Sequence, residues 1–374
     1  MDLTVDLGPL QYPVAFGLAF ALAAYLTPLI RRGALAYGVV DRPDGRLKQQ
    51  AEPVAYLGGV AIYLAFLFAL AFTYDFERSV LGLLLAASIV VMLGLFDDLK
   101  VLSPLLKLAG QTVAALVLIK AGVLIQLSFL PPIAALLLTL VWLVGMTNAI
   151  NLIDVSDGLA AGTASVAGIF LYVVALMSGD ETIAVLTVAL VGAALGFLIH
   201  NRPPATIYLG DTGSMFLGFM LGALAMRGHY TFEHRLAALA PVVILGVPIF
   251  DTLYVMGVRA YRGLPLMVGS PDHFAVRLRN NGFSAGLIAV LAYGVGTALG
   301  LAALAMILLP ATAAASVLGG VMVVAAGAVW ALWRLGRGPE AWPARSPPRD
   351  PEVGAAGAGA APTPTRFEPP ERRD

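Results

Sequence analysis

The chain has 374 residues, of which 59% are hydrophobic and 12% are charged, with a formal net charge of zero and no cysteine. A typical soluble domain carries about 25% charged residues, so this composition excludes an ordinary soluble protein and predicts an integral membrane protein. The balanced charge argues against a nucleic-acid partner, and the lack of cysteine excludes disulfides and thiolate metal sites.

A helix that crosses a bilayer needs roughly 20 mostly apolar residues. The runs are apolar throughout rather than alternating, which excludes spanning β-strands. We therefore expect an all-α integral membrane protein of about eleven transmembrane helices. These helices are expected near residues 11–30, 53–74, 78–96, 104–126, 129–147, 158–178, 182–200, 213–227, 236–258, 286–308 and 313–334.

The distribution of Lys and Arg between the loops predicts an N-terminus outside and a C-terminus inside the plasma (inner) membrane. Two inner segments, residues 31–52 and 259–285, are polar, basic and longer than simple connections need to be, so we expect them to line a cytoplasmic site. Residues 1–10 contain two acids and no positive charge, unlike a secretory signal. We expect one membrane domain over 1–335 and a disordered cytoplasmic tail over 336–374, which is rich in Pro, Ala and Gly.

The first polar motif in chain order is the pair Asp97 and Asp98, at the end of one apolar run, with Lys107 one turn inside the next. Adjacent carboxylates repel, so such a pair suits a general base or a site that faces a cation. A solvated helix end is the alternative interpretation of this pair alone.

The second motif, GMTNAINLIDVSDGLAAG, places Asn148, Asn151, Asp154 and Asp157 at steps of three. On a helix this spacing aligns them on one face. Their oxygen atoms suit Mg²⁺, which is commonly held by one or two protein groups together with substrate phosphates. The alternative is that they only cap two helices.

The remaining polar motifs lie in HNRPPATIYLGDTGS and in the last long inner loop. Asp211 stands at the expected start of a helix, where it could hold Mg²⁺ against a phosphate or act as an N-cap. Tyr208 could stack on a base or belong to the interfacial aromatic belt. His273 and Arg277 offer donors to phosphate oxygens. The usual excess of Lys and Arg in cytoplasmic loops could by itself explain the arginine.

Together these segments resemble the polyprenyl-phosphate N-acetylhexosamine-1-phosphate transferases, the superfamily that also holds phospho-MurNAc-pentapeptide transferase. The resemblance runs from about residue 41 to 284 and rests on DRPDGR, FDDLK, NAINLIDVSDGLAAG and IYLGDTGSMFLG. It implies ten or eleven transmembrane helices around a cytoplasm-facing cleft. It also implies a reaction in which undecaprenyl phosphate attacks a UDP-sugar, releases UMP and begins cell-envelope glycan synthesis.

The resemblance also implies a role for each motif residue. Asp211 and Asn151 would hold Mg²⁺, with Mn²⁺ as an alternative, and Asp97 or Asp98 would activate the acceptor phosphate. The substrate-binding residues would be Lys48, Lys107, Asn148, Asp154, Asp157, Asn201, Tyr208, His273 and Arg277.

The chain departs from the family pattern in three segments. In the first inner loop, Gln49 and Gln50 stand where the family commonly has a histidine. Val155 follows Asp154 where the family usually has glycine, and His273 stands without the clustered histidines that the family usually carries. We expect an N-acetylhexosamine-1-phosphate transferase of O-antigen, teichoic acid or capsule-type glycan synthesis. The alternatives are phospho-MurNAc-pentapeptide transferase, a transporter with intramembrane carboxylates, or an inactive scaffold. A homodimer is a further expectation.

Overall fold

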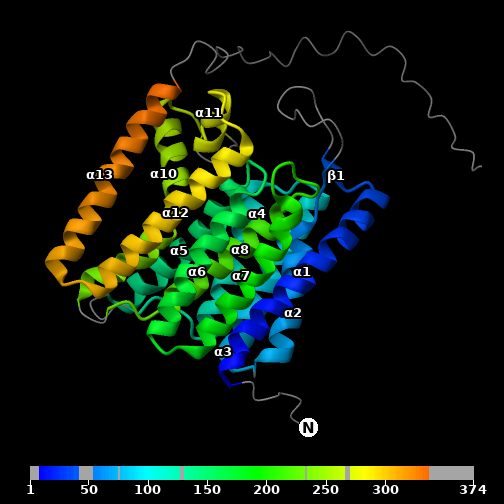
Figure 1. Ribbon diagram of the computed structural model, residues 1–374, viewed down its shortest axis with the longest axis horizontal. Coiled ribbons are helices and arrows are strands. Elements are labelled where there is room, and N and C mark those ends of the chain that lie inside the picture. The colour runs from blue at the N-terminus through cyan, green and yellow to red at the C-terminus, as the bar shows by residue number, and fades with distance from the viewer. Residues whose placement is uncertain are drawn as a thin grey trace, which may run out of the picture. The chain divides into compact units, whose positions relative to one another are not determined.

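The computed structural model describes residues 8–41, 54–74, 76–126, 130–231, 234–265 and 270–336. Its elements are almost all helices, as Figure 1 shows. The first part of the chain forms η1 (Gly8–Leu10), α1 (Gln11–Ala36), β1 (Val40–Asp41), β2 (Val54–Ala55), α2 (Gly58–Thr73), α3 (Arg78–Leu99), α4 (Pro104–Lys120) and α5 (Pro132–Ile153). The rest forms α6 (Leu159–Met177), α7 (Glu181–Asn201), α8 (Gly210–Arg227), η2 (Arg235–Leu239), α9 (Ala240–Ile244), α10 (Gly246–Tyr261), α11 (Phe274–Asn280), α12 (Ala285–Leu308) and α13 (Ala311–Leu335).

Seven described helices are long and apolar enough to cross a membrane, namely α1, α3, α5, α6, α7, α12 and α13. The segment from η2 to α10 adds an eighth if its two parts, which meet at 77°, form one broken span. The expected all-α membrane architecture is therefore confirmed. The helices α2 and α4, of 16 and 17 residues, and α8, of 18, are not among these candidates, so the count of eleven stays a prediction. The expected tail over 336–374 lies, apart from Gly336, outside the described residues.

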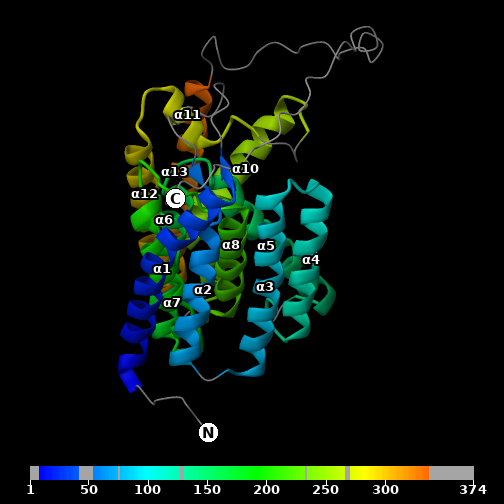
Figure 2. The ribbon, with the colours of Figure 1, turned by 90° about the vertical axis from the view of Figure 1, so that its right-hand side faces the viewer.

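Successive helices from α1 to α8 run in opposite directions, as Figures 1 and 2 show. The C-terminal ends of α1, α3, α5 and α7 therefore meet the N-terminal ends of α2, α4, α6 and α8 at the end of the bundle that carries β1. The loops that carry the polar motifs all connect elements at this end. Alternation of helix direction thus gathers the motifs that the sequence separates by more than 100 residues.

Glycine permits α8 to lie very close to α2 and α3 at this end. A Cβ atom added to Gly59 would lie 2.0 Å from the backbone nitrogen of Gly213, and one added to Gly94 would lie 2.5 Å from Cα of Thr212. Real Cβ atoms do not approach so closely, so any larger residue would push the helices apart. The first turn of α8 is therefore fixed by backbone contact with two neighbouring helices.

A proline inside α1 is matched by a histidine of α7. Pro28 has no N–H group, so the carbonyl of Ala24 loses its usual partner four residues later. His200 Nε2 lies 3.0 Å from that carbonyl oxygen and takes the place of the missing donor. The contact ties α1 to the last turn of α7.

Two short backbone pairings hold the loop that precedes α8. β1 pairs with β2 in an antiparallel register, and Ala55 in β2 forms a parallel bridge with Ile207. Tyr208 N donates to Ala55 O at 2.8 Å, and Gly58 N donates to Tyr208 O at 3.0 Å. The residues just before α8 are thus hydrogen-bonded to the residues just before and at the start of α2.

Candidate functional site

Asp98 caps the start of α8 from a different helix. Its Oδ1 accepts from the backbone N–H of Asp211 at 2.8 Å, and its Oδ2 accepts from the N–H and hydroxyl of Thr212 at 3.1 and 2.6 Å. The residue that precedes α8, Leu209, provides no side-chain cap, so Asp98 satisfies donors that would otherwise be unpaired. A Cβ on Gly210, whose φ is +72°, would lie 2.6 Å from this carboxylate. The carboxylate of Asp98 therefore fixes where Asp211 sits.

Lys107, in the first turn of α4, lies between two carboxylates. Its ammonium group forms ion pairs with Asp97 and with Asp211, the latter at 2.5 Å. Asp97 also accepts from the backbone N–H of Leu102 at 2.6 Å. About a quarter of the Lys107 and Asp211 side chains is exposed, against a tenth of Asp97. The group therefore opens towards solvent on the side of Lys107 and Asp211.

Asn151 joins the same group from the last turn of α5. Its amide Nδ2 donates to Asp211 Oδ1 and to the hydroxyl of Ser214, each at 2.9 Å. Asn151 Oδ1 makes no hydrogen bond with the described residues, so it is available to another donor or to a cation. The structure thus brings together four predicted site residues, Asp97, Lys107, Asn151 and Asp211.

The residues of this group fit Mg²⁺. Two carboxylates, those of Asp97 and Asp211, converge on one positive charge, that of Lys107, and the Asn151 amide oxygen lies beside them. Within the described ranges, no three His, Asp or Glu side chains form a complete metal site. That donor set suits Mg²⁺, which usually keeps only one or two protein ligands and takes the rest from phosphates and water.

Asn148 lies behind this group and is held by a residue that the motifs do not include. Its amide Nδ2 donates to Gln111 Oε1 at 2.6 Å and to the carbonyl of Val144 at 2.8 Å. Gln111, in α4, is almost fully buried. In the sequence, Gln111 is marked only by being a polar amide inside an apolar helix. The expected direct contact of Asn148 with substrate remains a prediction, and the structure shows a link between α4 and α5.

The turn between α5 and α6 presents Asp154 and Asp157. Asp157 Oδ2 accepts from the backbone N–H of Ala205 at 3.0 Å, and Asn201 Oδ1 accepts from the N–H of Gly158 at 3.1 Å. The carboxylate of Asp154 makes no hydrogen bond or ion pair with any described residue. Burial, together with the nearby charges of Asp211, Asp98 and Asp157, raises its pKa well above the usual range. Among the described residues of the site, Asp154 is therefore the carboxylate that has no partner.

Two tyrosines lie beside this turn. The rings of Tyr56 and Tyr208 are 5.9 Å apart between centroids, and burial raises the pKa of Tyr208 to about 12. Burial and the carboxylate of Asp41 likewise raise the pKa of Tyr56. Both phenols therefore remain hydrogen-bond donors at neutral pH. Tyr56 was not among the predicted site residues, and Lys48 lies outside the described residues.

His273 and Arg277 belong to a separate, buried group on α10, α11 and α13. His273 Nδ1 lies 2.6 Å from Asp251 Oδ2, and Arg277 pairs with Asp272 at 2.6 Å and donates to the carbonyl of Leu332 at 2.8 Å. His273 and Arg277 are only 3% and 5% exposed. The structure therefore does not bring them into the Asp211 group, and their predicted contact with substrate remains untested.

Arg279 is the residue of α11 that reaches the site. Its guanidinium donates to the hydroxyl of Ser156 at 2.6 Å, in the turn that carries Asp157. Its charge also acts on the ring hydroxyl of Tyr208. The His273 and Arg277 group fixes α11, and α11 in turn presents Arg279. Sequence spacing alone does not show which of the two arginines faces the site.

Comparisons with known protein sequences show the family to which the chain belongs. Residues 80–229 match the profile of Glycosyl transferase family 4. A probable undecaprenyl-phosphate N-acetylglucosaminyl 1-phosphate transferase of Bacillus subtilis is 33% identical over 292 residues, which cover 76% of this chain and 81% of that protein. The chain belongs to glycosyl transferase family 4.

Two other relatives are similar to this chain over much of its length. A decaprenyl-phosphate N-acetylglucosaminephosphotransferase of Mycolicibacterium smegmatis is 32% identical over 315 residues, covering 74% of this chain and 77% of that protein. A phospho-N-acetylmuramoyl-pentapeptide-transferase of Bacillus cereus is 31% identical over 267 residues, covering 65% of this chain and 80% of that protein. The resemblance drawn from the motifs is confirmed, as is the expectation of a phospho-sugar transferase rather than a transporter.

Proposed function

We propose that the chain transfers N-acetylglucosamine 1-phosphate, or a closely related N-acetylhexosamine 1-phosphate, from a UDP-sugar to undecaprenyl phosphate. The observation that carries the proposal is the continuous group of Asp97, Lys107, Asn151 and Asp211, which comes from four helices and meets at one end of the bundle. The names of the relatives support a polyprenyl phosphate as acceptor. We further propose that this end faces the cytoplasm of a plasma membrane, where UDP-sugars are available.

In the proposed reaction an oxygen of the lipid phosphate attacks the β-phosphorus of the UDP-sugar. The bond between the β-phosphorus and the bridging oxygen breaks, UMP leaves, and the sugar remains on a lipid diphosphate. A phosphate monoester loses its second proton with a pKa of about 6, so the acceptor needs little help from a base at neutral pH. The main requirement is to bring two anions together, which positioning and charge neutralisation satisfy.

The contacts suggest a division of these tasks between the two adjacent aspartates. Both oxygens of Asp98 are occupied by α8, so we assign it to holding Asp211 in place. Asp97 and Lys107 face each other beside Asp211, and we assign Lys107 to the acceptor or donor phosphate. Asp97 orients that lysine and receives any proton that the acceptor still carries.

Mg²⁺, held by Asp211 and Asn151, would supply charge neutralisation on the diphosphate. Asp157, in the turn, and Tyr208, beside it, are proposed to bind the uracil. Asp154, which has no partner among the described residues, is proposed to accept a donor from the nucleotide. Arg279 lies next to this turn and is proposed to pair with a phosphate oxygen. Together these residues would place the nucleotide on one side of Asp211 and the lipid phosphate on the other.

The test is UMP release by the purified chain with undecaprenyl phosphate, Mg²⁺ and UDP-N-acetylglucosamine. UDP-N-acetylgalactosamine and UDP-MurNAc-pentapeptide serve as competing donors. Asp211→Asn should abolish release, whereas Asp180→Asn, a matched change that affects only the N-cap of α7 at the opposite end, should preserve it. Release only with the pentapeptide donor would favour the phospho-MurNAc-pentapeptide transferase alternative. Silence of the folded protein with all three donors would contradict the proposal and favour an inactive scaffold.

A further inference from the structure

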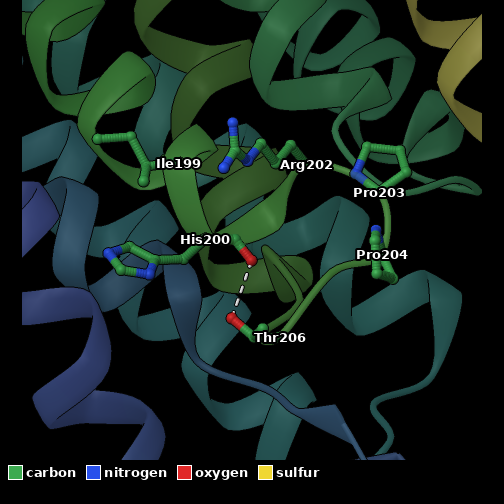
Figure 3. Close-up of a pocket in the computed structure, with 6 residues that line it drawn as sticks. All are labelled: Ile199, His200, Arg202, Pro203, Pro204 and Thr206. Carbon is green, nitrogen blue, oxygen red and sulfur yellow. Dashed lines mark hydrogen bonds between the residues drawn. The ribbon is translucent and has the colours of Figure 1, made fainter.

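A pocket outside the Asp211 group lies on the loop that joins α7 to α8. It has a volume of about 440 Å³, and Figure 3 shows the side chains that line it. Its lining consists of Ile199, His200, Arg202, Pro203, Pro204 and Thr206. The hydroxyl of Thr206 donates to the carbonyl of His200 at 3.0 Å, which closes the loop back onto the last turn of α7. This hydrogen bond restrains the loop at one edge of the pocket.

The polar side chains around this pocket are cationic or donors. Arg202 is exposed and forms no ion pair with any described residue. Arg31, from α1, donates through Nε to the carbonyl of Thr206 at 2.9 Å, and its two terminal nitrogens have no further partner in the described part of the chain. His200 also lines the pocket, and among the described residues no acid does so. Positive charge around a concave surface, with no counter-ion among the described residues, predicts an anionic ligand.

The surroundings of the pocket indicate that this anion carries an apolar tail. The pocket lies where α1 and α7, both long enough to cross a membrane, reach the end of the bundle. Ile199 in its lining is 43% exposed, and Leu29 on α1, two residues before Arg31, is 42% exposed. An apolar side chain in the lining, next to guanidinium groups that form no ion pair with the described residues, suits a lipid phosphate at the membrane boundary.

We propose that this pocket binds the phosphate of an anionic membrane phospholipid. Bidentate arginine contacts match phosphate oxygens, and an acyl chain can follow the exposed apolar residues of α1 and α7. The opposite face of the same loop contacts the catalytic end, because Ala205 N donates to Asp157 and Asn201 Nδ2 donates to the carbonyl of Ile207 at 2.9 Å. A bound headgroup would therefore hold in place the loop that carries Tyr208.

The test measures lipid binding directly, so it does not depend on the proposed transferase activity. The full chain in detergent is titrated with phosphatidylglycerol, and bound lipid is counted by native mass spectrometry. Phosphatidylcholine, undecaprenyl phosphate and inorganic phosphate are added in parallel as competitors. The variants are Arg202→Gln and Arg31→Gln, with Arg202→Lys as the conservative form. The control is Arg334→Gln, an exposed arginine near the end of α13, away from the pocket.

We expect one phosphatidylglycerol to bind in preference to phosphatidylcholine. Arg202→Gln and Arg31→Gln should each weaken its binding about fivefold, which corresponds to about 1 kcal/mol for one cation near anionic lipid. Arg202→Lys should restore most of the loss, and Arg334→Gln should change nothing. Since the substituted side chains are exposed, thermal melts of the variants should match the parent protein and show that all are folded.

Three results would overturn the proposal. Equal losses in the two pocket variants and the Arg334→Gln control would show general attraction to a basic surface. Displacement of phosphatidylglycerol by undecaprenyl phosphate at lower concentration would assign the pocket to the acceptor. Displacement by inorganic phosphate alone would assign it to a free anion.

Discussion

Replacing Asp98 by asparagine should lower stability as well as turnover. The carboxylate accepts three hydrogen bonds from the first turn of α8, at 2.8, 3.1 and 2.6 Å. Asparagine has the same shape but a single acceptor oxygen, so at best it keeps the two bonds from Thr212 and turns its NH₂ group towards the N–H of Asp211. That backbone donor is then left without a partner.

The size of the effect follows from those contacts. A buried donor that loses its partner costs about 1–3 kcal/mol. Removing a negative charge from a helix start costs a further ~0.3–1 kcal/mol, and more when the site is partly buried. We therefore expect Asp98→Asn to reduce the free energy of unfolding by about 2–4 kcal/mol. Asp211, released from its position, should also hold the proposed Mg²⁺ less well, and turnover should fall by orders of magnitude.

The assay compares thermal unfolding in detergent, UDP-sugar binding by calorimetry and UMP release for the same preparations. Thr212→Val is the matched control, because it removes one hydroxyl donor and leaves the carboxylate in place. It should cost about 1.5 kcal/mol and reduce turnover far less. Suppose instead that Asp98→Asn unfolds at the parent temperature and still binds UDP-sugar, yet releases no UMP. Asp98 would then act on the acceptor itself, and its assignment as a cap would be refuted.

Three further changes test other parts of the site and of the packing. Lys107→Met should abolish turnover. It should also tighten Mn²⁺ binding by the apo protein, measured by electron paramagnetic resonance, because the two carboxylates lose the ammonium group that competes with the metal. Unchanged Mn²⁺ affinity would contradict the proposed metal site. Asp154→Asn should raise the melting temperature at about pH 8 with Mg²⁺ chelated. The gain should vanish towards about pH 4, because the raised pKa makes the folded protein prefer the protonated acid and lose stability as pH rises; a gain that does not depend on pH would exclude this cause. Gly59→Ala should destabilise by about 1–3 kcal/mol or more in the same melts, because its Cβ would meet the backbone of Gly213. Gly257→Ala, with no atom within 4 Å of the added Cβ, should be neutral or slightly stabilising, and equal losses in both variants would show that contact is not the reason.

The sequence predicted which motifs share an end of the bundle, because alternating helices bring every second loop to the same side. It could not predict how Asp98 is used. Asp98 and Thr212 are 114 positions apart. Neither the spacing of the motifs nor the hydropathy of the chain shows how close α3 lies to α8. Whether an acid acts as a base or as a cap depends on that distance.

The last loop shows a second limit of sequence reasoning. Asp251 lies in a stretch that is apolar enough to be predicted as a span, and its carboxylate takes the histidine that the motif assigned to substrate. An acid within an apolar helix is itself a signal of an inward partner. Asp251 would have indicated that His273 is its partner rather than a substrate ligand. Arg279 would then have been the candidate from this loop for the site.

Some boundaries also moved for local reasons. The predicted span over 53–74 begins as a helix only at Gly58, because Val54 and Ala55 form a strand with β1. The span predicted to reach residue 126 ends at Lys120, and Gly122 follows with a φ of +94°. Neither backbone pairing nor a positive φ can be read from hydropathy.

Pro28 has a consequence for how this protein is made. A ribosome releases α1 long before it has synthesised His200, and during that interval the carbonyl of Ala24 has neither a helical partner nor its eventual donor. In a bilayer, an unpaired carbonyl is costly. The first helix therefore completes its hydrogen bonding only after six more helices have followed it. The carbonyl of Ala24 thus stays unpaired until α7 docks on α1, and products that end before α7 should remain open at this point to recognition by membrane quality control.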